Sequence, residues 1–340
     1  MRGIAAISKG CASMVQRHSL DHWQPDRNLA MELVRATEAA AMNATAFVGR
    51  GDKNAADGAA VDAMRRFLST VTMNGTVVIG EGEKDDAPWL YNGEQVGTGE
   101  GPDCDVAVDP IDGTSLTAAG RNGALSVIAV ADRGSMYDPS AVFYMDKLVC
   151  GAEGVGVVDL NQSVEDNIRE LAKAKKVDVS DIIVAVLDRP RHEQIIDEVR
   201  TTGASVRLLL DGDVAGGINA ARYDSTVDLC IGIGGTPEGI ITACAVKALG
   251  GVIQGRLWPR DEAERQRAVE AGHDLERVLG SDDLVASDNA YFVATGVTDS
   301  DFVAAPRRRG PFIRTESVVM RSHSGTIRTV VTDHRVDRWG

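Results

Sequence analysis

The sequence predicts an α/β protein, and three observations lead to this class. Between residues 161 and 249, amphipathic helical segments alternate with short apolar segments of strand length. This alternation is the order of βαβ units and predicts a sheet that is at least partly parallel. Earlier apolar segments at residues 76–80, 104–108 and 124–131 are typical of buried strands, and residues 289–332 form a β-rich tail.

Two helices are predicted before the first strand. Residues 27–48 are rich in alanine with an apolar spacing near 3.6, and Asp26 precedes them as a suitable N-cap. Residues 49–58 (GRGDKNAADG) follow as a polar, glycine-rich loop. The second helix is expected at residues 58–71, with Asp57 as its cap.

The later elements follow from the same patterns. Residues 141–150 alternate in polarity, as an antiparallel strand does. One predicted helix ends at Gly203, and another has Pro237 in its first turn, the place where proline is tolerated. The expected helices are residues 163–176, 191–203, 213–223 and 237–249, and the expected strands are residues 181–188, 205–210, 227–233, 290–296, 317–322 and 326–331.

Composition excludes several classes of protein. A formal net charge of −14 repels nucleic acid and anionic membranes. The densest basic run, Arg307-Arg308-Arg309, is read either as a solvated loop or as an anion contact. No apolar run reaches the ~18 residues of a membrane span. The five cysteines are odd in number and lack CxxC spacing, which predicts reduced thiols in a cytosolic protein.

Carboxylates recur where predicted elements begin or end. Asp57 lies at a helix start, Glu81 follows one strand, Asp109 and Asp112 follow another, and Glu238 follows a later strand and a glycine loop. Ligands of α/β proteins bind outside the carboxyl ends of strands, so these acids are expected to converge. They would repel one another without a cation, and oxygen ligands favour Mg²⁺ or Mn²⁺. The alternative interpretation is a set of separate, solvated surface acids.

The segment DPIDGTS combines residue types that suit a metal–phosphate site. Pro110 stiffens the exit from the strand, and Asp109 and Asp112, three positions apart in a turn, can point at one site. Gly113 allows close approach of the backbone, and Thr114 supplies a hydroxyl that can hold a water. A helix starting near Thr114 would present free N–H groups to phosphate. The alternative is an ordinary Asp/Pro/Gly turn.

Cations for a phosphate stand at other predicted element borders. Lys53 lies in the loop GRGDK, and Arg189 and Arg191 follow a strand in DRPRH. The acids of residues 211–213 (DGD) could accept hydrogen bonds from sugar hydroxyls. Each of these charges could equally be a solvated surface residue. The sequence lacks a GxxxxGK[ST] loop, and GIGGTPEG lacks GxGxxG spacing, so nucleotide-binding motifs find little support.

Six segments together resemble the class II fructose-1,6-bisphosphatases of bacteria: GRGDKNAADGAAVDAM, VVIGEGEKDDAP, DPIDGTS, DRPRH, DGDVA and GIGGTPEG. DPIDGT alone is shared with the wider lithium-sensitive phosphatases, and the other segments narrow the resemblance. It implies a layered αβαβα sugar-phosphatase fold with two mixed sheets. It also implies metal-dependent hydrolysis of the 1-phosphate of fructose 1,6-bisphosphate in gluconeogenesis, in the cytoplasm, by a homodimer or homotetramer, with Mg²⁺ or Mn²⁺.

The resemblance also implies a role for individual residues. The metal set is Asp57, Glu81, Asp109, Asp112 and Glu238, and the substrate set is Asp112, Gly113, Thr114, Tyr144, Arg189, Pro190, Arg191, Asp211, Gly212, Asp213 and Gly235. Lys53 and Asp85 match positions near the reaction centre. In the mechanism we expect, Thr114 orients the attacking water, and Asp57 or a nearby acid takes its proton.

Domain organisation follows from length and from this resemblance. A chain of 340 residues suggests about two domains. We expect residues 1–24 to be a disordered N-terminal extension, residues 25–160 a metal- and phosphate-binding half, and residues 161–340 a substrate-binding half.

Three other functions remain open on the sequence. They are a phosphatase that also accepts sedoheptulose 1,7-bisphosphate, an inositol monophosphatase, and a non-catalytic phosphosugar-binding regulator. The DRPRH segment disfavours the second, because it offers a clamp for a second phosphate. Thr114 disfavours the third, because a sensor needs no water-positioning hydroxyl.

Overall fold

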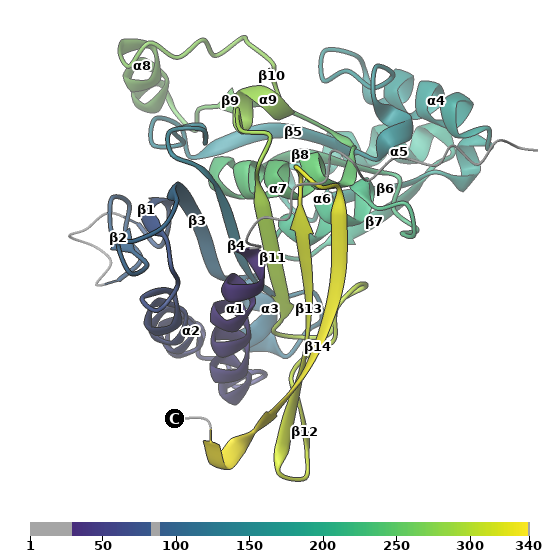
Figure 1. The fold of residues 1–340 in the computed structure, drawn as a ribbon. Helices are drawn as coiled ribbons and strands as arrows, with labels where there is room; N and C mark the ends of the chain where they lie inside the picture. Colours follow the sequence, from purple (N-terminus) through teal and green to yellow (C-terminus); the bar gives the residue numbers. More distant parts are fainter. Residues whose placement is uncertain (1–28, 83–88, 339–340) are drawn as a thin grey trace, which may run out of the picture.

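A computed structural model describes residues 29–82 and 89–338. Two mixed sheets and three helical layers make up the molecule (Figure 1). The predicted α/β class is therefore confirmed, and so is the αβαβα layering. The expected N-terminal extension (residues 1–24) and the cap Asp26 lie outside the described residues.

The first sheet has eight strands in the order β12-β13-β11-β4-β3-β1-β2, with β14 paired to β13. Only the β1–β3 pair is parallel among the pairs of this sheet. Its strands are β1 (Asn74–Ile79), β2 (Gln95–Val96), β3 (Asp103–Asp112), β4 (Leu125–Asp132), β11 (Tyr291–Gly296), β12 (Arg307–Arg309), β13 (Phe312–Arg321) and β14 (Thr326–Arg335).

The second sheet has six strands in the order β10-β9-β5-β8-β6-β7. Strand β6 runs parallel to both β7 and β8, as the predicted βαβ pattern requires, and β5 is antiparallel to β8 and β9. Its strands are β5 (Tyr144–Cys150), β6 (Ile183–Leu187), β7 (Ser205–Leu209), β8 (Leu229–Gly235), β9 (Val252–Trp258) and β10 (Leu279–Gly280).

The helices form layers on and between the sheets (Figure 1). Helices α1 and α2 cover the outer face of the first sheet, α6 and α7 lie between the sheets, and α4 and α5 cover the second. The α-helices are α1 (Ala30–Ala44), α2 (Lys53–Leu68), α3 (Thr114–Ala119), α4 (Val164–Lys175), α5 (Glu193–Thr202), α6 (Val214–Ala221), α7 (Thr236–Leu249), α8 (Glu262–Glu270) and α9 (Ser281–Leu284). Short 3₁₀ turns are η2 (Thr45–Phe47), η3 (Ala152–Gly154), η4 (Val179–Asp181), η5 (Pro190–His192) and η6 (Val336–Arg338).

Three apolar cores hold these layers together. The central core lies between the sheets around α7, whose residues from Gly239 to Val246 are buried all round. That burial explains why α7 is apolar on every side, whereas the outer helices α4 and α5 are amphipathic. The small side chains of α1 and α7 let helices and strands approach closely, which suits a sequence with few aromatic residues.

The order of the strands does not follow the order of the chain. Strand β5 precedes residue 160 but lies in the second sheet, and the tail strands β11–β14 return to the first sheet. The division at residue 160 stays a prediction. The four described cysteines, Cys104, Cys150, Cys230 and Cys244, are buried and unpaired, as expected for reduced thiols.

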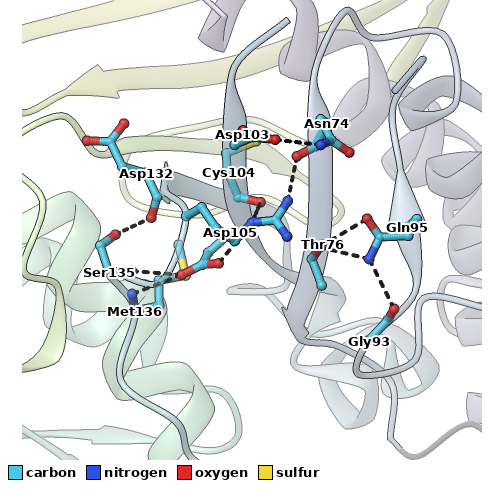
Figure 2. A network of polar contacts seen from close by, with 11 residues as sticks. Asn74, Thr76, Gly93, Gln95, Asp103, Cys104, Asp105, Asp132, Ser135 and Met136 are labelled. Carbon is cyan, nitrogen blue, oxygen red and sulfur yellow. Dashed lines mark hydrogen bonds and ion pairs between the residues drawn. The ribbon is translucent and has the colours of Figure 1, made fainter. Parts of the chain in front are cut away.

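A polar network fixes the beginning of β3 (Figure 2). The buried Asp105 carboxylate accepts hydrogen bonds from the backbone N–H groups of Ser135 and Met136, at 3.0 and 3.2 Å. Arg133 donates to the carbonyl oxygens of Cys104 and Asn74. The network connects β1, β3 and the loop after β4, and it thereby fixes the position of the first residues of β3.

Candidate active site

A cleft of about 750 Å³ opens where β1 and β3 end and where α2, α3, α6 and α7 begin. Segments far apart in the sequence therefore meet at one place, as expected for ligand sites of α/β proteins. Ten of the predicted site residues line this cleft: Lys53, Asp57, Glu81, Asp109, Asp112, Gly113, Thr114, Asp211, Gly212 and Glu238.

The position of Asp57 corrects one prediction. Helix α2 begins at Lys53, and its N-cap is Asp52, whose carboxylate accepts a hydrogen bond from the N–H of Ala55 at 2.9 Å. Asp57 therefore lies inside the helix, and the expected loop at residues 49–58 is shorter than predicted. The cap and the good helix formers after it outweigh the cost of Gly58 in the helix. Asp57 still reaches the cleft, where it shares a hydrogen bond with Glu81.

The DPIDGTS segment differs from prediction in its backbone. Strand β3 continues through Asp112 instead of ending at residue 108, so Asp109 and Asp112 belong to the strand. The ladder with β4 is irregular between these two residues, which is where Pro110 can sit without a lost strand hydrogen bond. The irregularity lets both carboxylates, three positions apart, face the same cleft.

We call Asp57, Glu81, Asp109, Asp112 and Glu238 the acidic cluster. Burial raises the pKa of every member, and it is the largest cause in each case. The pKa of Glu81 rises to about 8 through burial, the charge of Asp57, the hydrogen bond to Asp57 and the charge of Glu238. For Asp109, neighbouring carboxylates of the cluster add to burial and hold its pKa well above the ordinary value. For Asp112 and Glu238, burial and the neighbouring acids raise the pKa more than the charge of Lys147 lowers it.

The donor set fits a hard divalent cation. All five side chains offer carboxylate oxygens, the ligands that Mg²⁺ and Mn²⁺ prefer. One oxygen of Asp112 and one of Glu238 are buried without a hydrogen-bond partner among the described residues. As they stand, no three His, Cys, Asp or Glu side chains of residues 29–82 and 89–338 are gathered closely enough to hold a metal ion. The acids share a cleft, and coordination by them stays a prediction.

Thr114 is the first residue of α3, as predicted. Gly113 precedes it with a φ of 92°, a left-handed conformation that favours glycine and turns the chain sharply from β3 into the helix. Beside Thr114, Ser115 joins two other predicted residues. Its hydroxyl accepts a hydrogen bond from Lys53 Nζ at 2.5 Å, and its N–H donates to Asp211 Oδ2 at 3.1 Å. Ser115 was absent from the predicted site, although it belongs to the DPIDGTS segment.

Asp211 links the cleft to an arginine. Its other oxygen, Oδ1, pairs with Arg189 Nη2 at 2.9 Å. Gly212 packs against Asp112 so closely that a Cβ there would lie 2.7 Å from Asp112 Oδ1. Only glycine lets this loop approach the carboxylate. The geometry therefore explains the order acid–glycine–acid in residues 211–213.

Six of the predicted site residues do not line the cleft: Tyr144, Arg189, Pro190, Arg191, Asp213 and Gly235. Arg191 lies over the Tyr144 ring, 4.8 Å from its centroid, and donates to the carbonyl of Ile233. The buried His192 joins the same place, because its Nε2 accepts the N–H of Ile233 at 2.8 Å and its Nδ1 lies 2.8 Å from the carbonyl oxygen of Leu187. These contacts fix the DRPRH segment against the end of β8. The remaining predicted residue, Asp85, lies outside the described residues.

Several residues of the site were missed by the sequence analysis. Arg260 and Arg267 line the cleft from the β9–α8 region, and Phe143 lines it next to Tyr144. Arg260 directly follows Trp258-Pro259 at the end of β9, so the rule that found the other strand ends could have found it. Lys147 lies in the middle of β5 and is buried. In the sequence, the only indication of its role was a lysine in a segment expected to be a strand.

The layered fold and the cleft lined by carboxylates at the ends of strands define the class as an α/β protein with an acidic site. The family model described as bacterial fructose-1,6-bisphosphatase, glpX-encoded, matches residues 27–334. The chain belongs to this family, which confirms the resemblance read from its motifs.

Two curated relatives agree with this assignment. The chain is 44% identical over 325 residues to fructose-1,6-bisphosphatase class 2 of Haemophilus influenzae, covering 92% of this chain and 97% of that relative. It is 43% identical over 325 residues to fructose-1,6-bisphosphatase 1 class 2 of Escherichia coli strain K12, covering 92% and 96%. Within the described residues, we find no helix long and apolar enough to cross a membrane.

Proposed function

We propose that this protein hydrolyses the 1-phosphate of fructose 1,6-bisphosphate to give fructose 6-phosphate and phosphate. The observation that carries the proposal is the acidic cluster, which meets Thr114 and Lys53 in one cleft. Membership of the family supports the substrate, because both relatives are named fructose-1,6-bisphosphatases. We further propose that the reaction serves gluconeogenesis in the cytoplasm and that the protein acts as a homodimer or homotetramer.

The acidic cluster is proposed to hold Mg²⁺ or Mn²⁺. When bound, such a cation offsets the negative charge of the phosphate and lowers the pKa of water. The raised pKa values of the cluster support this role, because carboxyl groups that resist ionisation alone become good ligands once a cation compensates them.

The residues around the cluster take distinct parts in the reaction. Thr114 orients a water molecule through its hydroxyl, and Asp57, whose pKa is raised by burial, accepts the proton of that water. Water attacks phosphorus opposite the sugar oxygen, which leaves with the bonding electron pair and is then protonated. Ser115, which accepts a hydrogen bond from Lys53, would hold the lysine near the phosphate, and Asp85 is proposed as a further residue near the reaction centre.

The substrate is proposed to extend from Asp112, Gly113 and Thr114 toward the second sheet. There, the carboxylates of Asp211 and Asp213 would accept hydrogen bonds from sugar hydroxyls, with Gly212 and Gly235 giving the backbone room. The 6-phosphate would meet Tyr144 and residues 189–191, where the planar arginine side chains suit phosphate oxygens. Residues 25–160 would thus serve mainly the metal and phosphate, and residues 161–340 mainly the sugar.

A single assay separates this function from its alternatives. Phosphate release is measured from fructose 1,6-bisphosphate, sedoheptulose 1,7-bisphosphate and inositol 1-phosphate, each with Mg²⁺, with Mn²⁺ and with EDTA. We expect metal-dependent release from fructose 1,6-bisphosphate and little from inositol 1-phosphate. Comparable release from sedoheptulose 1,7-bisphosphate would make the enzyme a dual phosphatase. No release from any substrate with either metal would contradict the proposal and favour a binding protein.

A further inference from the structure

Lys147 is a buried lysine beneath the cleft. It lies on β5 between the partners β8 and β9, and only 6% of its surface is exposed. A lysine is rarely buried to this degree unless its charge is compensated. It does not line the cleft and is not part of the site proposed above.

The ammonium group of Lys147 joins the beginnings of two helices. Its Nζ lies 2.6 Å from Asp213 Oδ2, and Asp213 is the residue before α6. The same Nζ donates to the carbonyl oxygen of Gly235 at 3.0 Å, and Gly235 is the residue before α7. One side chain therefore connects the segment that carries Asp211 and Gly212 with the segment that carries Glu238.

The surrounding backbone packs closely against this pair. A Cβ at Gly234 would lie 1.9 Å from Asp213 Oδ2 and 2.9 Å from Lys147 Nζ. A Cβ at Gly239 would lie 3.1 Å from Lys147 Cδ. The glycines of GIGGTPEG thus make room for the lysine and its partner, which gives this motif a purpose besides approach to the substrate. The pair also borders an internal cavity of about 10 Å³, room for about one water molecule.

We propose that Lys147 is a positioning residue for the reaction. It sets the separation between the starts of α6 and α7, and through them places Asp211, Gly212 and Glu238 around the cleft. Because Lys147 would act by placing residues that contact the substrate, its loss should change substrate binding more than it changes the rate of the chemical step. The inference rests on the proposed function, since it concerns how the same cleft recognises its sugar phosphate.

The experiment compares Lys147→Met with the double variant Lys147→Met/Asp213→Asn. Methionine keeps the length of the side chain but removes the charge, which leaves the Asp213 carboxylate buried without its counter-ion. We expect Lys147→Met to melt at a lower temperature and to show a KM for fructose 1,6-bisphosphate raised about tenfold, with a smaller change in kcat. The double variant should regain most of the melting temperature. Because Asp213 is itself proposed to contact the sugar, the double variant is compared with Asp213→Asn alone, and its KM should be the higher of the two since the link to Gly235 is absent.

Lys247 provides a matched control. Its side chain is 9% exposed, and its Nζ likewise contacts a carboxylate and a carbonyl, Asp282 Oδ1 at 2.6 Å and the oxygen of Val285 at 2.9 Å, although the Asp282 carboxylate is exposed whereas that of Asp213 is largely buried. It lies near the other end of α7, away from the cleft. Lys247→Met should lower the melting temperature while leaving KM unchanged. A KM raised equally in both lysine variants would show that general loosening is responsible and would overturn the proposal.

Two further outcomes decide the matter. A wild-type KM in Lys147→Met, or a double variant whose KM does not exceed that of Asp213→Asn alone, would also overturn the positioning role. Binding is measured separately, as the rise in melting temperature caused by fructose 6-phosphate in EDTA, and Lys147→Met should require about tenfold more of it. Wild-type protein that binds fructose 6-phosphate but releases no phosphate with either metal would contradict the proposed function and leave the positioning role supported by the binding measurement alone.

Discussion

Two groups of charged side chains lie at or beside the cleft, and they differ in whether opposite charges of the protein balance them. Burial raises the pKa of all five carboxylates of the cluster, and neighbouring acids add to this rise for each of them except Asp57. Two of the cluster's oxygens are buried without a partner among the described residues.

Beside the cluster, Lys147 is paired with Asp213 and Arg189 with Asp211, and we call these two ion pairs the paired charges. Arg191 lies next to them and donates to the carbonyl oxygen of Ile233. Both ion pairs lie within the protein, although Asp213 Oδ1 is buried without a hydrogen-bond partner in the part of the chain that the structure describes. The acids of the cluster, in contrast, form no ion pair among the described residues.

The two groups therefore differ in what they need in order to adopt their functional arrangement. Paired charges of opposite sign hold one geometry before any ligand arrives, which reduces the cost of ordering the site on binding. A cluster of like charges gains its counter-charge only with the cation, so it couples the reaction to metal binding.

The clearest contrast between the acidic cluster and the paired charges should come from neutralising one acid in each. In Asp109→Asn, kcat/KM should fall about a thousandfold, or ~4 kcal/mol, because a ligand and a charge of the cluster are removed. Its melting temperature in EDTA should stay level or rise, since repulsion is relieved. Asp213→Asn should melt lower, because Lys147 loses its counter-ion. Melting curves of both variants in EDTA at pH 8 make the comparison, and a loss of equal size in both would show that the two regions do not differ.

Thr114→Ala removes the neutral hydroxyl within the acidic cluster. We expect kcat to fall about a hundredfold while KM changes little, because the lost contact orients the water rather than the substrate. Steady-state kinetics with saturating Mg²⁺ measure the change. Thr201→Ala, which removes an exposed hydroxyl bonded to Asp197 on α5, is the control and should behave as wild type. Near-normal turnover in Thr114→Ala would remove this threonine from the mechanism.

Arg191→Ala tests whether this arginine, which lies beside the paired charges, binds the second phosphate of the substrate. KM for fructose 1,6-bisphosphate should rise about tenfold with little change in kcat, because a contact common to ground and transition states is lost. KM for fructose 1-phosphate, which lacks the second phosphate, should barely change. The exposed Arg200, which pairs with Asp197, gives the control Arg200→Ala. Equal effects on both substrates would exclude Arg191 from recognition of that phosphate.

The smallest effect concerns pH. The folded-state pKa of Glu81 is about 8, above its ordinary value of 4.5, so its contribution to stability is full below pH 4.5 and is lost as pH rises through about 8. In EDTA the melting temperature should therefore decline between pH 6 and pH 8. Mg²⁺ replaces the proton, so the stabilisation by Mg²⁺ should increase over the same interval by a few degrees. Differential scanning calorimetry measures it; stabilisation that is independent of pH would argue against metal binding at Glu81.

Much of the site could be read from the sequence because its residues stand at element borders. Glu81 follows β1, Asp109 and Asp112 lie among the last residues of β3, Thr114 begins α3 and Glu238 lies in the first turn of α7, and all five line the cleft. The exact ends of helices and strands were harder to predict from the sequence. Asp52 and Asp57 are both plausible caps, and only the folded helix identifies Asp52. The strand through Pro110 also escaped prediction, because proline normally ends a strand unless the ladder is already irregular there.

The sequence alone indicated the α/β class, the alternating helices and strands between residues 163 and 249, three strands of the tail, the acids near element ends and the family. These depend on local periodicity and on short motifs, which act over a few residues. The same patterns gave no sign of β9, α8, β10, α9 or β12. Only the tertiary structure decided that β5 joins the second sheet, that the tail returns to the first, and that Lys147 bridges α6 and α7. Such contacts join residues dozens of positions apart, and what fixes them is the packing of whole layers around shared cores.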